Sequence, residues 1–281
     1  DRHDAEHNIF VEHNDTSGIN GSSPSGNSVT RDSDDIILKF TRQGKLVKQF
    51  AGRSVNLGSK DPNSVNKPGD LFVYAKTNEV FVADGYGNRR ILIVDADTGK
   101  YIGHFGAYGG NPVDDAGSAA AGRWISDSMK GNKKPAFFRN PVHCIKLAED
   151  GKIYVCDRGN DRIQVFDKNS TELGKPCSNP DGVAGKCGFV AERWISGNTE
   201  TIPAMPGTSV SLNFSKDKGQ SCLYVGDNSN MTIYLLNRPN LQELGRLGRS
   251  GRNAGQLHWL HPVSLGSHGN ISTAEVATAL I

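Results

Sequence analysis

The sequence has no long apolar run. In its 281 residues, no segment approaches the roughly 20 consecutive apolar residues that a helix needs to cross a bilayer. The first residues, Asp1 to Asp4, lack the apolar core of a secretory signal peptide. We therefore expect a chain without a membrane span, from which any export signal is already absent.

Charge of one sign is not concentrated anywhere. The chain carries 32 Lys and Arg against 30 Asp and Glu, and the basic residues are spread along it, which argues against a nucleic-acid partner. It has no Gly-x-Ser-x-Gly motif and no Cys paired in motif with His, and the Gly-rich stretch 248–255 lacks a strand-to-helix context. A hydrolase nucleophile and a phosphate-binding loop therefore have no candidate.

Glycine, in contrast, is abundant. The 33 Gly residues stand beside 12 Pro and many short apolar runs, a composition typical of short strands joined by tight turns. With 36% hydrophobic residues the chain is also long enough to bury a sizeable core. We therefore predict an all-β fold.

A repeat with a long period indicates which all-β architecture the chain adopts. Three short β-rich runs, Glu79–Asp84, Lys152–Asp157 and Cys222–Asp227, each end in Asp, at intervals of 73 and 70 residues. Each is preceded by an apolar run entered through Pro or Gly, and each is followed by a Gly/Asn/Ser turn and further apolar runs. Four short strands per unit cannot bury both faces alone, so the units must pack radially. The sequence therefore predicts a β-propeller of about five to six four-stranded blades.

The repeat also sets the domain organisation, a single propeller domain over 1–281 with incomplete blades at both ends. The segments 7–12, 35–40 and 46–52 would supply three strands without the first, and 261–265 and 270–275 two strands without the rest. Two alternatives are open: the ends complete one shared blade, or the sequence is part of a longer protein, which we favour. Polar insertions near 16–33, 107–136 and 175–186 explain the long intervals and form either a binding surface or decoration.

Five cysteines bear on folding. Cys177 and Cys187 bracket a polar loop with little apolar content, so we expect a disulfide to close it. Cys144 and Cys156 lie in two apolar runs, where they either face each other across adjacent strands or are small buried residues. We expect Cys222 to be free.

The cysteines and a set of glycosylation triplets favour an extracellular protein, or a periplasmic one if the source is bacterial. The triplets Asn-x-Ser/Thr are acceptor sites if a eukaryotic cell exports the chain. They begin at Asn14, Asn20, Asn169, Asn213, Asn230 and Asn270.

Two segments carry a family resemblance. The segments 82–91, Val-Ala-Asp-Gly-Tyr-Gly-Asn-Arg-Arg-Ile, and 156–163, Cys-Asp-Arg-Gly-Asn-Asp-Arg-Ile, resemble NHL repeats. Together with Asn140-Pro141-Val142-His143 they also resemble peptidyl-hydroxyglycine amidating lyase. The likeness to NHL propellers extends over nearly the whole chain, whereas the likeness to the lyase rests on about four positions.

The lyase resemblance implies a zinc site at the central channel. In that family three His ligands hold the zinc, a Tyr acts as base and Arg groups bind the substrate carboxylate. By motif, His143 and His261 match two ligands, Tyr86 matches the base and Arg158 matches one Arg. The third His would precede the first visible strand, and Trp259-Leu260-His261-Pro262 lacks the Met and the acidic residue that flank the family's ligand.

Each of these residues also has a structural interpretation. His143 and His261 would then be hydrogen-bonded residues of inner strands, Tyr86 would cap its blade, and Arg158 would lock neighbouring blades with an Asp. Asp84, Asp157 and Asp227 recur once per blade, and we interpret them as architectural groups that accept turn N–H bonds.

Two functions follow from these alternatives. The favoured one is an extracellular scaffold that binds a protein or peptide through its loop face, and the other is a zinc-dependent lyase acting at the channel. The oligomeric state is not indicated by the sequence.

Overall fold

The computed structural model describes residues 4–13, 35–50, 58–114, 135–175, 177, 179, 181–195 and 207–275. These residues form strands and turns, with two short 3-10 turns, η2 (Ala107–Gly109) and η4 (Arg158–Asn160). Among them no helix is long and apolar enough to cross a membrane. The all-β prediction is confirmed.

Three complete four-stranded sheets form the centre of the chain. In each sheet consecutive strands pair antiparallel, so every sheet is a meander. The first comprises β4 (Asp70–Tyr74), β5 (Glu79–Asp84), β6 (Arg90–Asp95) and β7 (Tyr101–Phe105). The second comprises β8 (Val142–Leu147), β9 (Lys152–Asp157), β10 (Arg162–Asp167) and β11 (Phe189–Trp194). The third comprises β12 (Ser209–Phe214), β13 (Cys222–Asp227), β14 (Thr232–Asn237) and β15 (Glu243–Leu247).

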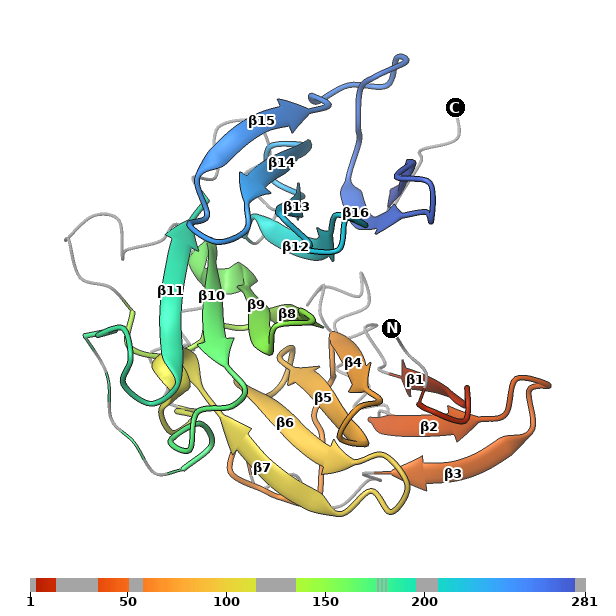
Figure 1. The fold of residues 1–281 in the computed structure, drawn as a ribbon, viewed down its shortest axis with the longest axis vertical. Coiled ribbons are helices and arrows are strands. Elements are labelled where there is room, and N and C mark those ends of the chain that lie inside the picture. The colour runs from red at the N-terminus through yellow and green to blue at the C-terminus, as the bar shows by residue number, and fades with distance from the viewer. Residues whose placement is uncertain are drawn as a thin grey trace, which may run out of the picture.

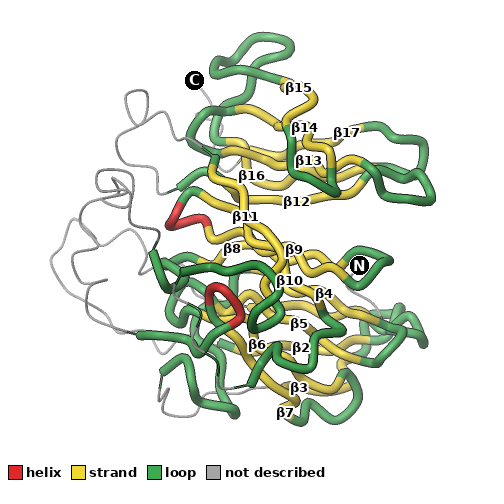
Figure 2. The backbone as a smooth tube through the Cα atoms, turned by 60° about the vertical axis from the view of Figure 1, so that its left-hand side comes forward, coloured by secondary structure: helices red, strands yellow, loops and turns green. Residues whose placement is uncertain are grey.

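The sheets are arranged as propeller blades. Figure 1 shows the first strands β4, β8 and β12 toward the middle of the molecule and the last strands β7, β11 and β15 toward the outside. The innermost strands contact one another, β4 against β8 and β8 against β12. Figure 2 shows successive sheets stacked face to face, which is how units with two apolar faces bury both.

Two partial sheets flank these blades. One contains β1 (Ile9–His13), β2 (Ile36–Phe40) and β3 (Leu46–Phe50), and the other contains β16 (Leu260–Leu265) and β17 (Ile271–Glu275). Strand β1 packs against β4 as β5 packs against β8, so β1 occupies the second position of its blade. Because β17 is also a second strand, the described residues do not form the shared blade that was one alternative.

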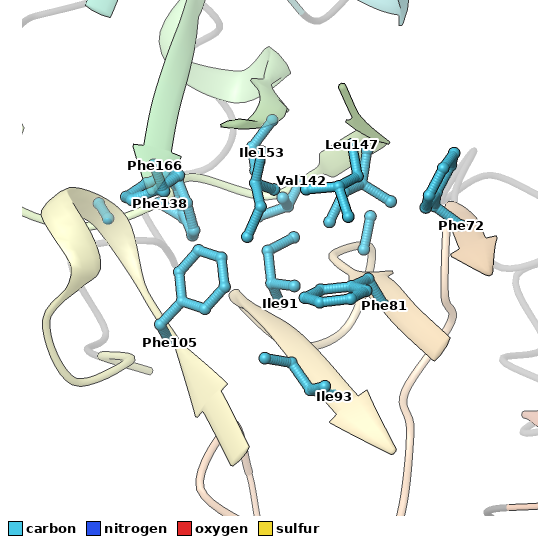
Figure 3. Packing of buried hydrophobic residues seen from close by; sticks show 14 of the residues in the cluster. Phe72, Phe81, Ile91, Ile93, Phe105, Phe138, Val142, Leu147, Ile153 and Phe166 are labelled. Atoms are coloured by element: carbon cyan, nitrogen blue, oxygen red, sulfur yellow. The ribbon is translucent and has the colours of Figure 1, made fainter. Parts of the chain in front are cut away.

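The cores lie between neighbouring blades. Phe81 and Ile91 of one blade meet Ile153 and Phe166 of the next, and all four are at most 1% exposed (Figure 3). Full burial of such a side chain stabilises the fold by about 1.5–3 kcal/mol. Equivalent apolar clusters fill the other blade interfaces. Hydrophobic burial between blades therefore holds the propeller together.

The repeated Asp residues end the second strand of each complete blade, as the repeat predicts. The Asp84 carboxylate accepts a hydrogen bond at 2.9 Å from Arg90 Nε, and the Asp157 carboxylate accepts one at 2.6 Å from Arg162 Nε. All four side chains are fully buried. Asp227 instead accepts bonds from the turn N–H groups of residues 229 and 230.

Two disulfides are present. Cys177 and Cys187 are bridged, with Cα atoms 5.9 Å apart, as predicted. Cys144 and Cys156 face each other across β8 and β9 and are also bridged, so the cross-strand alternative is the one observed. Cys222 is free, as expected.

The described parts of two insertions lie against each other. The Asn111 N–H donates to the Cys177 carbonyl oxygen at 3.3 Å, and a Cβ atom at Gly182 would lie 2.4 Å from the Tyr108 ring. The disulfide loop therefore packs on the η2 segment of the preceding blade. The predicted insertion at 16–33 and residues 115–134 lie outside the described residues.

Candidate functional site

The site is built on β-bulges at the start of three innermost strands. In β8 the pairing register shifts between Val142 and Cys144, which leaves His143 as the extra residue. The same shift in β12 leaves Val210, and in β16 it falls at 261–262. Strand β4 pairs without such a shift. A bulge reorients the local side chain, so these positions differ from the regular pleat of the strands that follow.

His143 is fixed by a hydrogen bond to the neighbouring blade. Its side chain is 4% exposed, and its Nδ1 donates to the Val210 carbonyl oxygen at 2.8 Å. Because a carbonyl oxygen can only accept, this bond places the proton on Nδ1 and leaves Nε2 as an acceptor. Burial lowers the pKa of His143 well below its ordinary value, and electrostatic interactions with Arg158 and with the His261 ring lower it further. The ring is therefore neutral.

His261 lies against His143. The two ring centroids are 4.8 Å apart and the rings meet edge to face at 74°. Burial lowers the pKa of His261, the charge of Arg158 lowers it further, and Asp70 acts in the opposite direction. Two neutral imidazoles from alternate blades therefore meet near the axis.

Tyr86 approaches this pair from the preceding blade. Its ring centroid lies 5.6 Å from that of His143. The turn that carries it passes so close to β8 that a Cβ atom at Gly85 would lie 1.9 Å from the Val142 carbonyl oxygen. Only glycine fits there. Asn140 Nδ2 also donates to the Tyr86 carbonyl oxygen, so the turn is held on both sides.

Arg158 is the buried cation of the site. It opens η4 directly after Asp157 and is 5% exposed. Its Nη1 donates to the Tyr86 hydroxyl oxygen at 3.3 Å, whereas its buried Nε has no hydrogen-bond partner among the described residues. Burial lowers the pKa of Arg158, and the charges of Tyr86, Asp161 and Asp227 act in the opposite direction.

The structure thus brings together all four residues singled out for the channel, Tyr86, His143, Arg158 and His261. In the part of the chain that the structure describes, no third His, Cys or carboxylate joins the two imidazoles at metal-ligand distance. The three-residue cluster that does have this spacing, Glu172 with Cys177 and Cys187, contains two disulfide-bonded cysteines. A disulfide sulfur is not a thiolate, so that cluster is not a metal site.

Sequence reasoning missed two contributors. The Val210 carbonyl oxygen orients His143, but a backbone acceptor leaves no mark in the sequence. Asp161 ends η4 in the left-handed conformation with φ 55°, next to Arg158, and the short Arg-Gly-Asn-Asp turn was the signal that could have found it.

The glycosylation triplets fall into three groups. Asn14 and Asn20 lie outside the described residues, and Asn169 and Asn270 are exposed. The other two use their amide nitrogens: Asn213 Nδ2 donates to the Val263 carbonyl oxygen, and Asn230 Nδ2 to Asp227 at 2.6 Å.

These meander sheets with their central inward-facing site define the class of the protein, a β-propeller. A family profile described as the NHL repeat matches residues 142–166, which include β8, β9 and most of β10. The chain therefore contains an NHL repeat and resembles NHL-repeat β-propellers.

Two curated relatives agree with this. The mouse (Mus musculus) peptidyl-glycine alpha-amidating monooxygenase is 31% identical over 133 residues, which cover 47% of this chain and 11% of that protein. The human (Homo sapiens) NHL repeat-containing protein 3 is 28% identical over 138 residues, which cover 48% of this chain and 32% of that protein. The aligned regions thus span a minor part of both relatives.

Solved structures include similar folds. The β-propeller domain of Myceliophteria thermophila Cps50 (Swd1) superposes with a TM-score of 0.47 at 10% identity, covering 86% of this chain and 57% of that chain.

Proposed function

We propose that the propeller is a lyase that cleaves N-acyl-α-hydroxyglycines at its channel, with a zinc ion held by His143 and His261. The observation that carries the proposal is the convergence of Tyr86, His143, Arg158 and His261 from three blades. The 31% identity over 47% of this chain to a peptidyl-glycine alpha-amidating monooxygenase supports a related glycine-derived substrate. The proposal gives the channel residues the roles that the family resemblance implies.

The donor set fits a zinc ion in part. The Nδ1 of His143 is bound to a carbonyl oxygen, which leaves Nε2 as the acceptor nitrogen of the ring, and metal-binding histidines use this arrangement. His261 would supply a second nitrogen from the ring beside it. When bound, zinc supplies Lewis acidity toward a substrate hydroxyl oxygen.

Two protein side chains would then bind the substrate and move its proton. Arg158 would bind the substrate carboxylate, for which its buried guanidinium is suited. Tyr86 would take the proton of the α-hydroxyl group. As the hydroxyl oxygen becomes a carbonyl, the Cα–N bond breaks, its electron pair stays with nitrogen, and nitrogen takes up a proton. The products are a primary amide and glyoxylate, so atoms and charge balance.

Turnover tests the base. With N-benzoyl-α-hydroxyglycine as substrate, we expect glyoxylate release above the uncatalysed rate, and Tyr86→Phe should lower kcat by about a hundredfold or more. Tyr101→Phe is the matched control, because that phenol binds His104 on β7 instead. No glyoxylate above background from the unaltered chain, or full activity in Tyr86→Phe, would overturn the assignment.

Metal content tests the ligands separately. After dialysis against limiting zinc, we expect one zinc per chain, lost in His143→Ala and in His261→Ala. His104→Ala should keep the metal, because His104 is tied to Tyr101. Equal zinc in the His143→Ala protein would show that the imidazoles are structural.

A second function, binding of a protein or peptide through the loop face, is favoured by the contact between the two insertions. Val113 and Val183 lie on these two segments and are 40% and 45% exposed. The two disulfides support an extracellular or periplasmic location. Peptides selected from a display library should bind at least about tenfold more weakly to the Val113→Ser/Val183→Ser protein. Equal binding would argue against this surface.

A further inference from the structure

One short segment contacts both of the turns that carry Tyr86 and Arg158. The turn with Tyr86 follows β5 and the turn with Arg158, η4, follows β9, so the two turns belong to neighbouring blades. Residues 137–141, which lead directly into β8, form hydrogen bonds to both turns, and we call them the connector. These bonds are therefore suited to fix the relative position of the two side chains.

The connector holds η4 through its backbone. The Pro141 carbonyl oxygen accepts the Gly159 N–H at 3.4 Å, and the Phe137 carbonyl oxygen accepts Asn160 Nδ2 at 3.0 Å. A Cβ atom at Gly159 would lie 2.6 Å from the Asn140 carbonyl oxygen, so the two backbones are in direct contact. Because the connector contributes backbone oxygens, a side-chain substitution in it leaves these bonds in place.

The connector holds the Tyr86 turn with a side chain. The Tyr86 N–H donates to the Lys67 carbonyl oxygen at 3.0 Å, which ties the turn to its own blade. Asn140 Nδ2, from the next blade, donates to the Tyr86 carbonyl oxygen. The Asn140 amide is thus a direct bond between the Tyr86 backbone and the blade that carries Arg158.

The side chains of the two turns meet at the channel. Arg158 Nη1 donates to the Tyr86 hydroxyl oxygen at 3.3 Å, and the Tyr86 ring centroid lies 5.6 Å from that of His143. Because an arginine N–H can only donate, this contact holds the Tyr86 oxygen as an acceptor. A general base must present an acceptor at a fixed place, so the role proposed for Tyr86 depends on this contact.

We propose that Asn140 is a positioning residue of the channel, which holds the Tyr86 hydroxyl against Arg158 and beside His143. The connector binds η4 through its backbone, so Arg158 keeps its place when the Asn140 amide is removed. Tyr86 then loses its bond to the blade that carries Arg158. This inference deepens the proposed function and rests on Tyr86 as the base of that function.

Cleavage of N-benzoyl-α-hydroxyglycine tests the inference by the split between kcat and KM. Asn140→Ala should lower kcat about tenfold or more, since displacing a reacting group by about 1 Å can cost about a hundredfold. KM, and the Kd of the unreactive analogue N-benzoylglycine, should stay within about twofold, because Arg158 still binds the carboxylate. Asn140→Asp, whose ionised carboxylate has the shape of the amide but cannot donate, should behave in the same way.

A measurement without turnover tests the same geometry. In protein labelled at its Tyr and His rings, we expect a nuclear Overhauser effect between Tyr86 and His143 in the unaltered chain, and its loss in both Asn140 variants. Asn179→Ala is the matched control, because Asn179 Nδ2 also donates to a backbone carbonyl oxygen, that of Val183 at 3.1 Å, but in the disulfide loop. This control should keep the Overhauser effect, kcat and KM. Thermal unfolding checks that each variant is folded.

The outcomes separate this inference from the proposed function. Full kcat in both Asn140 variants, or an Overhauser effect that persists in both, would overturn the inference. So would a parallel loss of kcat and of N-benzoylglycine binding, because Asn140 would then support the whole connector. A chain that releases no glyoxylate would lose the lyase assignment, whereas the Overhauser effect would still decide whether Asn140 holds Tyr86 beside His143.

Discussion

At the scale of single residues, the fold and the candidate site use the same chemistry of buried charges. Asp84 and Asp157 are neutralised by arginines of their own blades, whereas the buried Arg158 donates to the Tyr86 hydroxyl oxygen at the candidate site. Removing one partner of a buried pair typically costs about 3–5 kcal/mol, so both pairs contribute to the stability of the first two complete blades. Arg158 is not part of either of these two Arg–Asp ion pairs.

The free energy of unfolding should vary with pH because of the raised pKa of Asp161. Its pKa is raised to about 7 in the folded protein, above the value near 3.9 of an unfolded chain. A raised pKa means that the folded state holds the proton more tightly, so this stabilisation is complete below about pH 4 and disappears as pH rises through about 7. Asp161→Asn should therefore gain stability relative to the unaltered chain as pH rises, by on the order of 4 kcal/mol.

Urea unfolding of the two proteins at pH 5, 6, 7 and 8 measures this difference. Contributions from all other titrating groups are common to both proteins and cancel. Parallel curves of unfolding free energy against pH would show that Asp161 is ionised throughout and would contradict the prediction.

Residue identities at the site could be predicted only in part. The motifs around Tyr86, His143 and Arg158 are local in sequence, so a resemblance could find them. The Val210 carbonyl oxygen that orients His143 could not be found in this way, because this contact depends on which blades are neighbours.

At the scale of elements, the strands were the most predictable feature and the bulges the least. The Gly-rich turns and β-rich runs predicted the three second strands with the observed bounds. A bulge adds one residue without changing the composition of the strand, so the sequence did not indicate that residues 143 and 210 interrupt the pairing. These interruptions set the orientation of the site.

The disulfide loop offers a test at this scale. Replacing Cys177 and Cys187 together by Ser should lower the unfolding free energy by about 3 kcal/mol, because the bridge closes a short loop in the unfolded chain. Thermal unfolding of the double variant against the oxidised parent measures the loss. Cys222→Ser is the control, since Cys222 is free. An unchanged melting temperature would show that packing on η2 holds the loop by itself.

At the scale of the whole molecule, the long-period repeat made the fold predictable. Three runs ending in Asp at nearly equal intervals require equivalent units, and units with two apolar faces require radial stacking. What the repeat could not show is how the ends lie. Both partial sheets contribute a second strand, so they remain separate in the described residues.

The surface of the molecule also predicts which glycosylation triplets are used if a eukaryotic cell secretes the chain. Asn169 and Asn270 are exposed and should carry glycans. Asn213 and Asn230 should not, because their amide nitrogens donate hydrogen bonds within the fold. Glycopeptide mass spectrometry of the secreted protein shows which of these Asn residues carry a glycan. A glycan at Asn213 would contradict the placement of β12 against β16.

The bulges have an evolutionary consequence. Each bulge interrupts the alternation of an innermost strand that builds the blade cores, and it falls at His143 in β8, at Val210 in β12 and at residues 261–262 in β16. A mutation there changes the chemistry of the channel while the apolar residues between blades stay as they are. Duplicated blades could in this way diverge in activity, one position at a time, on an unchanged scaffold.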